Sequence, residues 1–184
     1  MNTQAELWAV TRELAEPAEP SGRSFRTAEL DALFAELRTG DLAARREAED
    51  AIWAVWCDHP EPAARERMAF GIAALAGGQL DQARALFDQL VDGYPDWAET
   101  WNKRATVLFL LGADAASVAD IRRTLDLEPR HFGALGGLAQ IALRNGNPDA
   151  ARAALQALLA SNPLASGVSE IIDTIDRDAP KTIH

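Results

Sequence analysis

Residues 98–129 read AETWNKRATVLFLLGADAASVADIRRTLDLEP, and this stretch decides the fold. Gly112 separates two segments of helix length, and Pro129 ends the second because proline cannot continue a helix. The glycine and the proline both recur 34 residues away on either side, at Gly78, Gly146, Pro95 and Pro163. A period of this size is typical of stacked helical hairpins, each a pair of antiparallel helices.

The period also fixes a register for the side chains. With each proline placed at position 32, the repeating units are residues 64–97, 98–131 and 132–165. Spacings of three and four residues put positions 4, 7, 8 and 11 on one stripe of the first helix, and positions 20, 24 and 27 on one stripe of the second. Small residues at positions 8 and 20 let the two helices approach closely. A single hairpin cannot cover both of its apolar faces, so the units must stack.

This pattern resembles the tetratricopeptide repeat family, over residues 64–165 and most closely in the middle unit. The resemblance implies an all-α fold: an α-solenoid, that is, a right-handed superhelix of stacked antiparallel helix pairs, with three 34-residue repeats plus capping helices. Two residues depart from the family pattern. Arg67 and Arg104 occupy positions that are usually apolar, and we expect their long side chains to reach toward solvent.

The flanking residues are expected to extend the same stack. Two apolar stripes predict helices over 27–39 and 41–58, broken at Gly40. The predicted parts around the repeats are a flexible or weakly docked N-terminal segment (1–26), a degenerate capping hairpin (27–63), a C-terminal capping helix (166–178) and a tail (179–184). Residues 27–184 then form a single helical repeat domain.

Charge excludes one class of partner. The 184 residues carry a net charge of −10, with a pI near 4.7. Phosphate binding is driven by Lys and Arg, so we expect no nucleic-acid partner. Residues 1–63 hold 6 basic and 13 acidic side chains, whereas residues 64–165 hold 10 and 11. The acidity therefore belongs mainly to the N-terminal third, where we interpret it as solvated surface.

No apolar stretch approaches the length of a membrane span, and we expect no membrane partner. Residues 1–20 lack the charged start and apolar centre of a secretory signal. The expected location is cytoplasmic; a periplasmic location would require that a signal peptide had been removed.

The sequence shows no constellation typical of an enzyme. His59, His131 and His184 are far apart along the chain, and Cys57 is the single cysteine. None of them has a second His or Cys at metal-ligand spacing, and no nucleophile stands beside a base. We therefore expect no catalytic site, no metal and no cofactor, and we interpret His131 as a packing residue between two repeats.

The resemblance implies that the first helix of each unit lines a concave groove. The residues assigned to this groove are Arg65, Met68, Ile72, Asn102, Lys103, Thr106, Phe109, Gly133, Gly136, Gly137, Gln140 and Arg144. Gly136 and Gly137 lie in mid-helix, where each costs about 1 kcal/mol relative to Ala. They serve either close packing or a shallow trough for a bound segment, and the sequence leaves both open.

Family members that clamp the acidic C-terminus of cytosolic chaperones use Lys, Asn and Arg at five groove positions. In this sequence those positions hold Met68, Ile72, Lys103, Gly133 and Gly137. Four of the five lack the required hydrogen-bonding group, so we do not expect this chain to clamp a chaperone tail.

Three functions remain. The first is an interaction adaptor that binds another protein, through a peptide or helix segment, in the groove; Lys103 and Arg144 would suit an acidic segment. The second is a structural scaffold or self-associating subunit of a larger assembly. The third, and most remote, is an enzyme with an unrecognised site.

Overall fold

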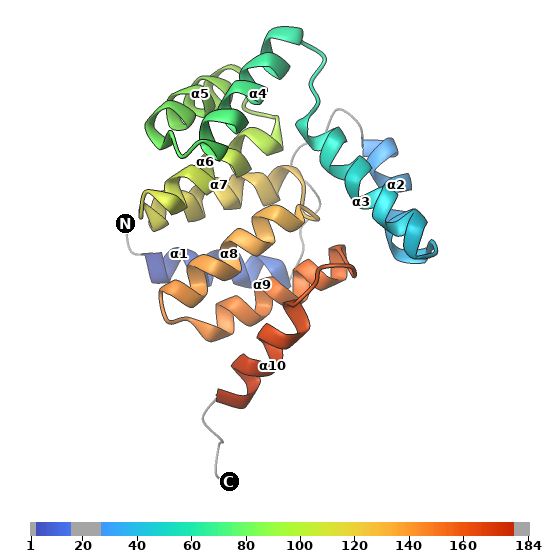
Figure 1. Ribbon diagram of the computed structural model, residues 1–184. Coiled ribbons are helices and arrows are strands. Elements are labelled where there is room, and N and C mark those ends of the chain that lie inside the picture. Colours follow the sequence, from blue (N-terminus) through green and yellow to red (C-terminus); the bar gives the residue numbers. More distant parts are fainter. Residues whose placement is uncertain (1–2, 16–26, 179–184) are drawn as a thin grey trace.

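The computed structural model describes residues 3–15 and 27–178 (Figure 1). Over these ranges the chain forms ten α-helices and no strand. The helices are α1 (Thr3–Ala15), α2 (Thr27–Thr39), α3 (Leu42–Cys57), α4 (Pro62–Ala76), α5 (Leu80–Gly93), α6 (Ala98–Leu110), α7 (Asp114–Leu127), α8 (Phe132–Arg144), α9 (Pro148–Ser161) and α10 (Val168–Asp178). None of them is long and apolar enough to cross a membrane.

Six of the helices form three consecutive hairpins, α4–α5, α6–α7 and α8–α9, in which each helix packs against its partner and against the next hairpin. The turns inside the hairpins contain Gly78, Gly112 and Gly146, whose φ angles are 70°, 75° and 67°. Only glycine adopts such angles without strain, which explains why it recurs at this position.

Small residues let the helices of one hairpin approach closely, as their spacing predicts. The Ser117 hydroxyl donates a hydrogen bond to the Ala105 carbonyl oxygen at 2.7 Å. At Gly71, an added Cβ would come within 2.7 Å of the Phe87 ring. These positions therefore set the distance between the paired helices.

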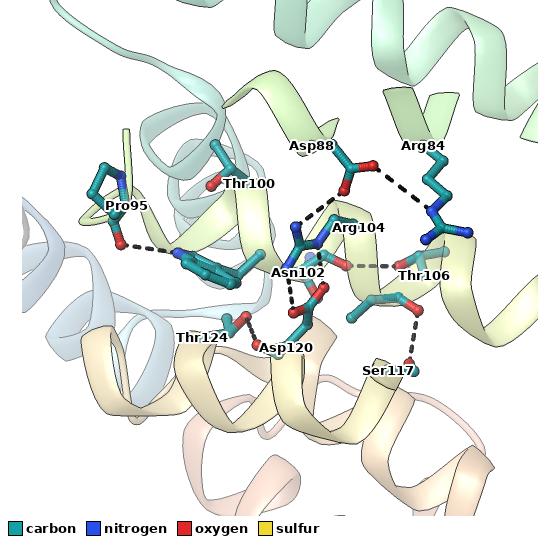
Figure 2. Close-up of polar contacts among 12 residues, drawn as sticks. Arg84, Asp88, Pro95, Thr100, Asn102, Arg104, Thr106, Ser117, Asp120 and Thr124 are labelled. Atoms are coloured by element: carbon teal, nitrogen blue, oxygen red, sulfur yellow. Dashed lines mark hydrogen bonds and ion pairs between the residues drawn. The ribbon is translucent and has the colours of Figure 1, made fainter. Parts of the chain in front are cut away.

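Arg104 does not reach toward solvent, which corrects the expectation for this residue. Its guanidinium donates two hydrogen bonds to Asp120, at 2.7 and 2.8 Å, and a third to Asp88 at 3.0 Å (Figure 2). Asp88 belongs to the preceding hairpin, so the ion cluster joins α5, α6 and α7. A charged side chain is tolerated at this position because the two carboxylates pair with it.

The α2–α3 hairpin forms but does not extend the stack beyond α4, which corrects that expectation. It is set apart from α4 and α5 (Figure 1), and α3 packs instead against α6 and the start of α8. The rings of Trp56 and His131 stack with centroids 4.0 Å apart, and Phe34 meets Phe132 edge-on at 6.5 Å. Burial of these four rings favours the position that the hairpin takes.

This arrangement leaves the α4 end of the stack uncovered. Phe70, at position 7 of its unit, is 59% exposed. Leu138, at the same position of the last unit, is fully buried. The difference arises because a preceding hairpin covers Leu138 and no hairpin covers Phe70.

Residues 3–15 form α1, which lies against α7 and α9 (Figure 1). Leu7 and Val10 are buried in the main core, and the Gln4 side chain donates a hydrogen bond to the Asn145 carbonyl oxygen at 2.8 Å. The rest of the segment expected to be flexible or weakly docked, residues 16–26, lies outside the described residues, as does the predicted tail, 179–184. At the other end, α10 packs on α9 through the buried Val168 and Ile175.

Candidate functional site

The first helices of the hairpins and the displaced hairpin together enclose a cavity of about 510 Å³, which we call the groove cavity. α6 and α8 supply much of its lining, and α3, α7, α9 and the segment 162–166 supply the rest. Seven residues assigned to the groove from the sequence line it: Asn102, Thr106, Phe109, Gly133, Gly136, Gly137 and Gln140. Its volume is in the usual range for ligand pockets.

The three glycines of α8 have different surroundings. A Cβ added at Gly136 would lie 3.4 Å from Leu158 Cδ1, and one at Gly137 would lie 3.4 Å from Ile121 Cδ1. Both are ordinary contact distances. A Cβ at Gly133 would come within 2.7 Å of Trp53 Cη2. Gly133 is therefore needed for the packing of α3, whereas Gly136 and Gly137 line the groove cavity and leave room in it because they have no side chain.

The walls of the groove cavity are aromatic. Trp53 meets Phe132 edge-on with centroids 5.0 Å apart, and both line the cavity. Phe109 also lines the cavity, and the Arg144 guanidinium lies 3.7 Å from its ring centroid. These rings offer apolar contact to whatever enters.

A buried polar cluster lies behind the Trp53 wall. Glu99, which is fully buried, accepts hydrogen bonds from Asn102 Nδ2 at 3.0 Å and from His131 Nε2 at 2.8 Å. His131 Nδ1 accepts a bond from the Ala134 N–H at 3.2 Å, so the ring proton is on Nε2. His131 thus caps α8 and pairs with α6, which agrees with its interpretation as a packing residue between repeats.

Lys103, which was expected to bind an acidic segment in the groove, belongs to this cluster and does not line the groove cavity. Its Nζ lies 2.9 Å from Glu99 Oε1 and 5.4 Å from the Trp53 ring centroid. Burial would raise the pKa of Glu99, but the hydrogen bond from His131 and the charge of Lys103 lower it to about 2. Burial lowers the pKa of Lys103, but Glu99 more than offsets this and raises it. The two groups therefore stay charged and bound to each other.

Arg144, the second residue expected to bind an acidic segment, is also paired within the chain. It pairs with Asp114, and its two terminal nitrogens each donate to the Phe109 carbonyl oxygen at 3.1 Å. Lys103 and Arg144 are therefore both paired within the chain and do not line the cavity.

The three groove residues assigned to α4 do not line the groove cavity either. Met68 is 1% exposed and packs in a second core with Phe87 and Trp97, which corrects its assignment. Ile72 packs against the same core. Arg65 donates to the carbonyl oxygens of His59 and Pro60, at the turn before α4. Without a neighbouring hairpin in the usual place, this end of the concave face is not enclosed.

Of the described residues that line the groove cavity, twelve were not assigned to it from the sequence, and two of these are polar side chains that meet each other. Glu49 of α3 and Asn162, which follows α9, meet through a hydrogen bond from Asn162 Nδ2 to Glu49 Oε1 at 2.6 Å. Glu49 stands in an acidic run that is typical of solvated helix surface. No local signal could have placed it here, because the repeat register says nothing about where α3 lies.

The described part of the chain offers neither a metal-binding cluster nor a reactive thiol. It holds no group of three His, Cys, Asp or Glu side chains placed to bind a metal ion. Burial, followed by the charge of Glu99, raises the pKa of the Cys57 thiol to about 12. Since the thiolate is the reactive form, Cys57 is poorly suited to act as a nucleophile.

A second cavity of about 590 Å³ lies between α9 and α10. Leu143, Ile171 and Ile175 supply its apolar lining, and Arg152 at its edge pairs with Asp176. None of the twelve residues assigned to the groove lines this cavity.

Stacked helical hairpins with a cavity on the concave side are typical of helical repeat proteins. Comparison with known proteins supports this class. Two models of the tetratricopeptide repeat family match the chain, one over residues 68–131 and one over residues 113–181. Together they span most of the chain from α4 to α10. The chain belongs to the tetratricopeptide repeat family, as the 34-residue period predicts.

Sequence relatives carry the same repeats. A TPR repeat-containing protein of Rhizobium etli is 35% identical over 119 residues, which are 64% of this chain and 58% of that protein. DnaJ homolog subfamily C member 3 of Bos taurus and of Homo sapiens are each 31% identical over 98 residues, which are 53% of this chain and 19% of those proteins. This chain therefore spans less than two thirds of the length of the curated relatives that it matches.

A solved structure confirms the fold class. The first TPR of Spaghetti (RPAP3), bound to the HSP90 peptide SRMEEVD, aligns with a TM-score of 0.59 and 17% sequence identity. The alignment covers 62% of this chain and 90% of that one. The predicted all-α solenoid of stacked helix pairs is confirmed. Repeats of this family are typically non-enzymatic modules that mediate protein–protein interactions.

Proposed function

We propose that this protein is an interaction adaptor that receives a short segment of a partner protein in the groove cavity. The observation that carries the proposal is the convergence of three separate elements, α3, α6 and α8, on one cavity with aromatic walls and a glycine floor. The peptide-bound tetratricopeptide structure supports a protein partner. An HSP90 peptide is not the partner that we propose, because four of the five chaperone-clamp positions of this chain lack the required hydrogen-bonding group. The expectations of a cytoplasmic location and of no nucleic-acid or membrane partner belong to this proposal and rest on the sequence.

A segment that enters this cavity must be short or extended. The cavity has a volume of about 510 Å³. This space holds a few side chains and is too small for a helix of several turns, whose diameter with side chains is about 10 Å. An extended peptide that inserts one or two side chains suits the space, and this is one of the modes by which grooves recognise peptides.

A displayed library of random peptides selected against the immobilised protein tests the proposal. Gly136→Leu should abolish binding of the selected peptides, because the added side chain projects from the cavity floor. Gly93→Leu is the matched control, since a Cβ at Gly93 meets no atom within 4 Å and this residue does not line the cavity. If the selected peptides bound Gly136→Leu as tightly as the parent protein, the groove cavity would not be the binding site.

Self-association is the second candidate, because the α4 end of the stack exposes Phe70 where a further hairpin would pack. Light scattering coupled to size exclusion, at rising concentration, measures it. The parent protein should form a dimer that Phe70→Glu disperses. A parent protein that stays monomeric at the highest soluble concentration would remove this candidate.

A further inference from the structure

We propose that the groove cavity selects a basic side chain, lysine or arginine, of the bound segment, and that Glu49 is the carboxylate that pairs with it. This inference rests on the proposed function and names the chemistry of the partner. It replaces the expectation of an acidic segment, which depended on Lys103 and Arg144.

The first argument is the charge of the lining. Among the described residues that line the groove cavity, Glu49 carries the only charge. Lys103 is held by Glu99, and Arg144 by Asp114 and the Phe109 carbonyl oxygen. An acidic ligand would therefore meet an unscreened carboxylate and no cation, in a protein whose net charge is −10.

The second argument is that Glu49 is positioned for a ligand. Asn162, which is 2% exposed, donates to Glu49 Oε1 at 2.6 Å and is itself fixed by the Leu164 N–H, which donates to its Oδ1 at 2.9 Å. This contact orients the carboxylate without neutralising it. No Lys or Arg of the described residues forms an ion pair with Glu49, and its Oε2 has no hydrogen-bond partner among them.

The third argument is that the neighbouring polar groups present acceptors. Asn102 uses its Nδ2 to donate to Glu99, so its Oδ1 remains as an acceptor. The Thr106 hydroxyl donates its proton to the Asn102 carbonyl oxygen at 3.0 Å, which leaves the lone pairs of its oxygen. The exposed Gln140 amide and Ser166 hydroxyl can each donate or accept. The lining thus suits a ligand rich in N–H groups, and an ammonium or guanidinium group meets that need.

The apolar walls complete the match. Trp53, Phe109 and Phe132 provide surface along which the methylene stem of a lysine or arginine can lie while its charged end reaches Glu49. The attraction for the charged end then comes from the Glu49 carboxylate, because Arg144 and Lys103 already lie over the Phe109 and Trp53 rings.

Three synthetic pentapeptides test the inference: Ac-Ala-Leu-Lys-Leu-Ala-amide and the same peptide with norleucine or Glu at the centre. Binding is followed by the amide resonances of ¹⁵N-labelled Gly136 and Gly137, which lie on the cavity floor, with Gly93 as the distant reference. The lysine peptide should shift the two floor resonances and bind about tenfold more tightly than the norleucine peptide. The glutamate peptide should not shift them.

Glu49→Gln should reduce the affinity for the lysine peptide by about tenfold and leave the norleucine peptide unaffected. This variant keeps the oxygen that accepts from Asn162, so the fold is preserved. Asp50→Asn, an exposed acid next to Glu49 that does not line the cavity, should change neither affinity. Added salt should narrow the difference between the lysine and norleucine peptides.

Equal binding of the lysine and norleucine peptides, or an unchanged lysine affinity in Glu49→Gln, would overturn the basic selectivity while leaving the groove cavity as a peptide site. If none of the peptides shifted the floor resonances at millimolar concentration, both the selectivity and the proposed function would fail.

Discussion

Trp53 lies directly on Gly133: an added Cβ at that glycine would come within 2.7 Å of the indole. The contact joins α3 to α8, two helices that are 80 positions apart at these residues. Gly133, one of the three glycines of α8, therefore provides the space in which Trp53, a residue from outside the repeats, packs.

We predict opposite effects for two glycine substitutions in α8. Gly133→Ala should destabilise the protein by about 1–2 kcal/mol, because the Trp53 ring is held by Trp56 and Phe132 and cannot move aside. Gly136→Ala should stabilise it by up to about 1 kcal/mol, since its Cβ meets only an ordinary contact. Urea unfolding of both variants measures the difference. Equal stabilisation by the two would mean that Trp53 does not depend on Gly133.

The buried Glu99 should make the free energy of unfolding depend on pH in the acidic range. Its pKa falls from 4.5 in the unfolded chain to about 2 in the folded protein, so the folded state holds the proton less tightly. Its contribution is therefore complete above pH 4.5 and is lost as the pH falls toward 2. At neutral pH, Glu99→Gln should cost about 3 kcal/mol.

The free energy of unfolding of the parent protein and of Glu99→Gln should converge as the pH is lowered through this range. Glu66→Gln, at an exposed carboxylate of α4, serves as control and should track the parent protein. A constant gap between parent and Glu99→Gln down to pH 2 would contradict the prediction.

Removing Arg104 alone should be costly. Arg104→Leu restores the apolar residue usual at this position but leaves Asp120, which is largely buried, without its partner, at a cost of about 3–5 kcal/mol. The double variant Arg104→Leu, Asp120→Leu should recover most of this loss, because no unpaired buried charge remains. Thermal and urea unfolding of the single and double variants form the test. Purely additive losses would show that the pair does not act as a unit.

α1 should contribute to the stability of the whole molecule. Leu7 is fully buried against the core shared with α7 and α9. Leu7→Ala should lower the free energy of unfolding by about 2–5 kcal/mol. Trp8→Ala, at a half-exposed position one residue along, should have little effect. An undiminished stability in Leu7→Ala would mean that α1 is detached in solution.

The regular part of the fold could be predicted from the sequence, and the placement of its flanks could not. Gly112 and Pro129 repeat at a fixed interval, and stacking follows because each hairpin must cover its apolar faces. The α2–α3 hairpin has no such constraint. Its position depends on which surface buries Trp53 and Trp56 best, and a pattern along one segment carries no information about that surface.

The same limit explains the outcome for the groove. The repeat register brought together Asn102, Thr106 and Gly136, because they stand on helices whose mutual packing is periodic. The pairing of Lys103 with Glu99 was open to sequence reasoning, because side chains four residues apart on a helix are neighbours. The pairing of Arg144 with Asp114 and the arrival of Glu49 from outside the repeats have no such local signal, since these residues lie on separate helices.

The packing of α1 and of the α2–α3 hairpin against the later repeats has a consequence for how the protein folds. Repeat solenoids usually fold from neighbour to neighbour, since each unit touches only the next. Here, the hydrogen bonds from Asn162 to Glu49 and from Asn147 to Gln4 span 113 and 143 residues of sequence. Such distant closures raise the contact order, so we expect slower folding and a single cooperative unfolding transition in place of the gradual fraying of a simple repeat array.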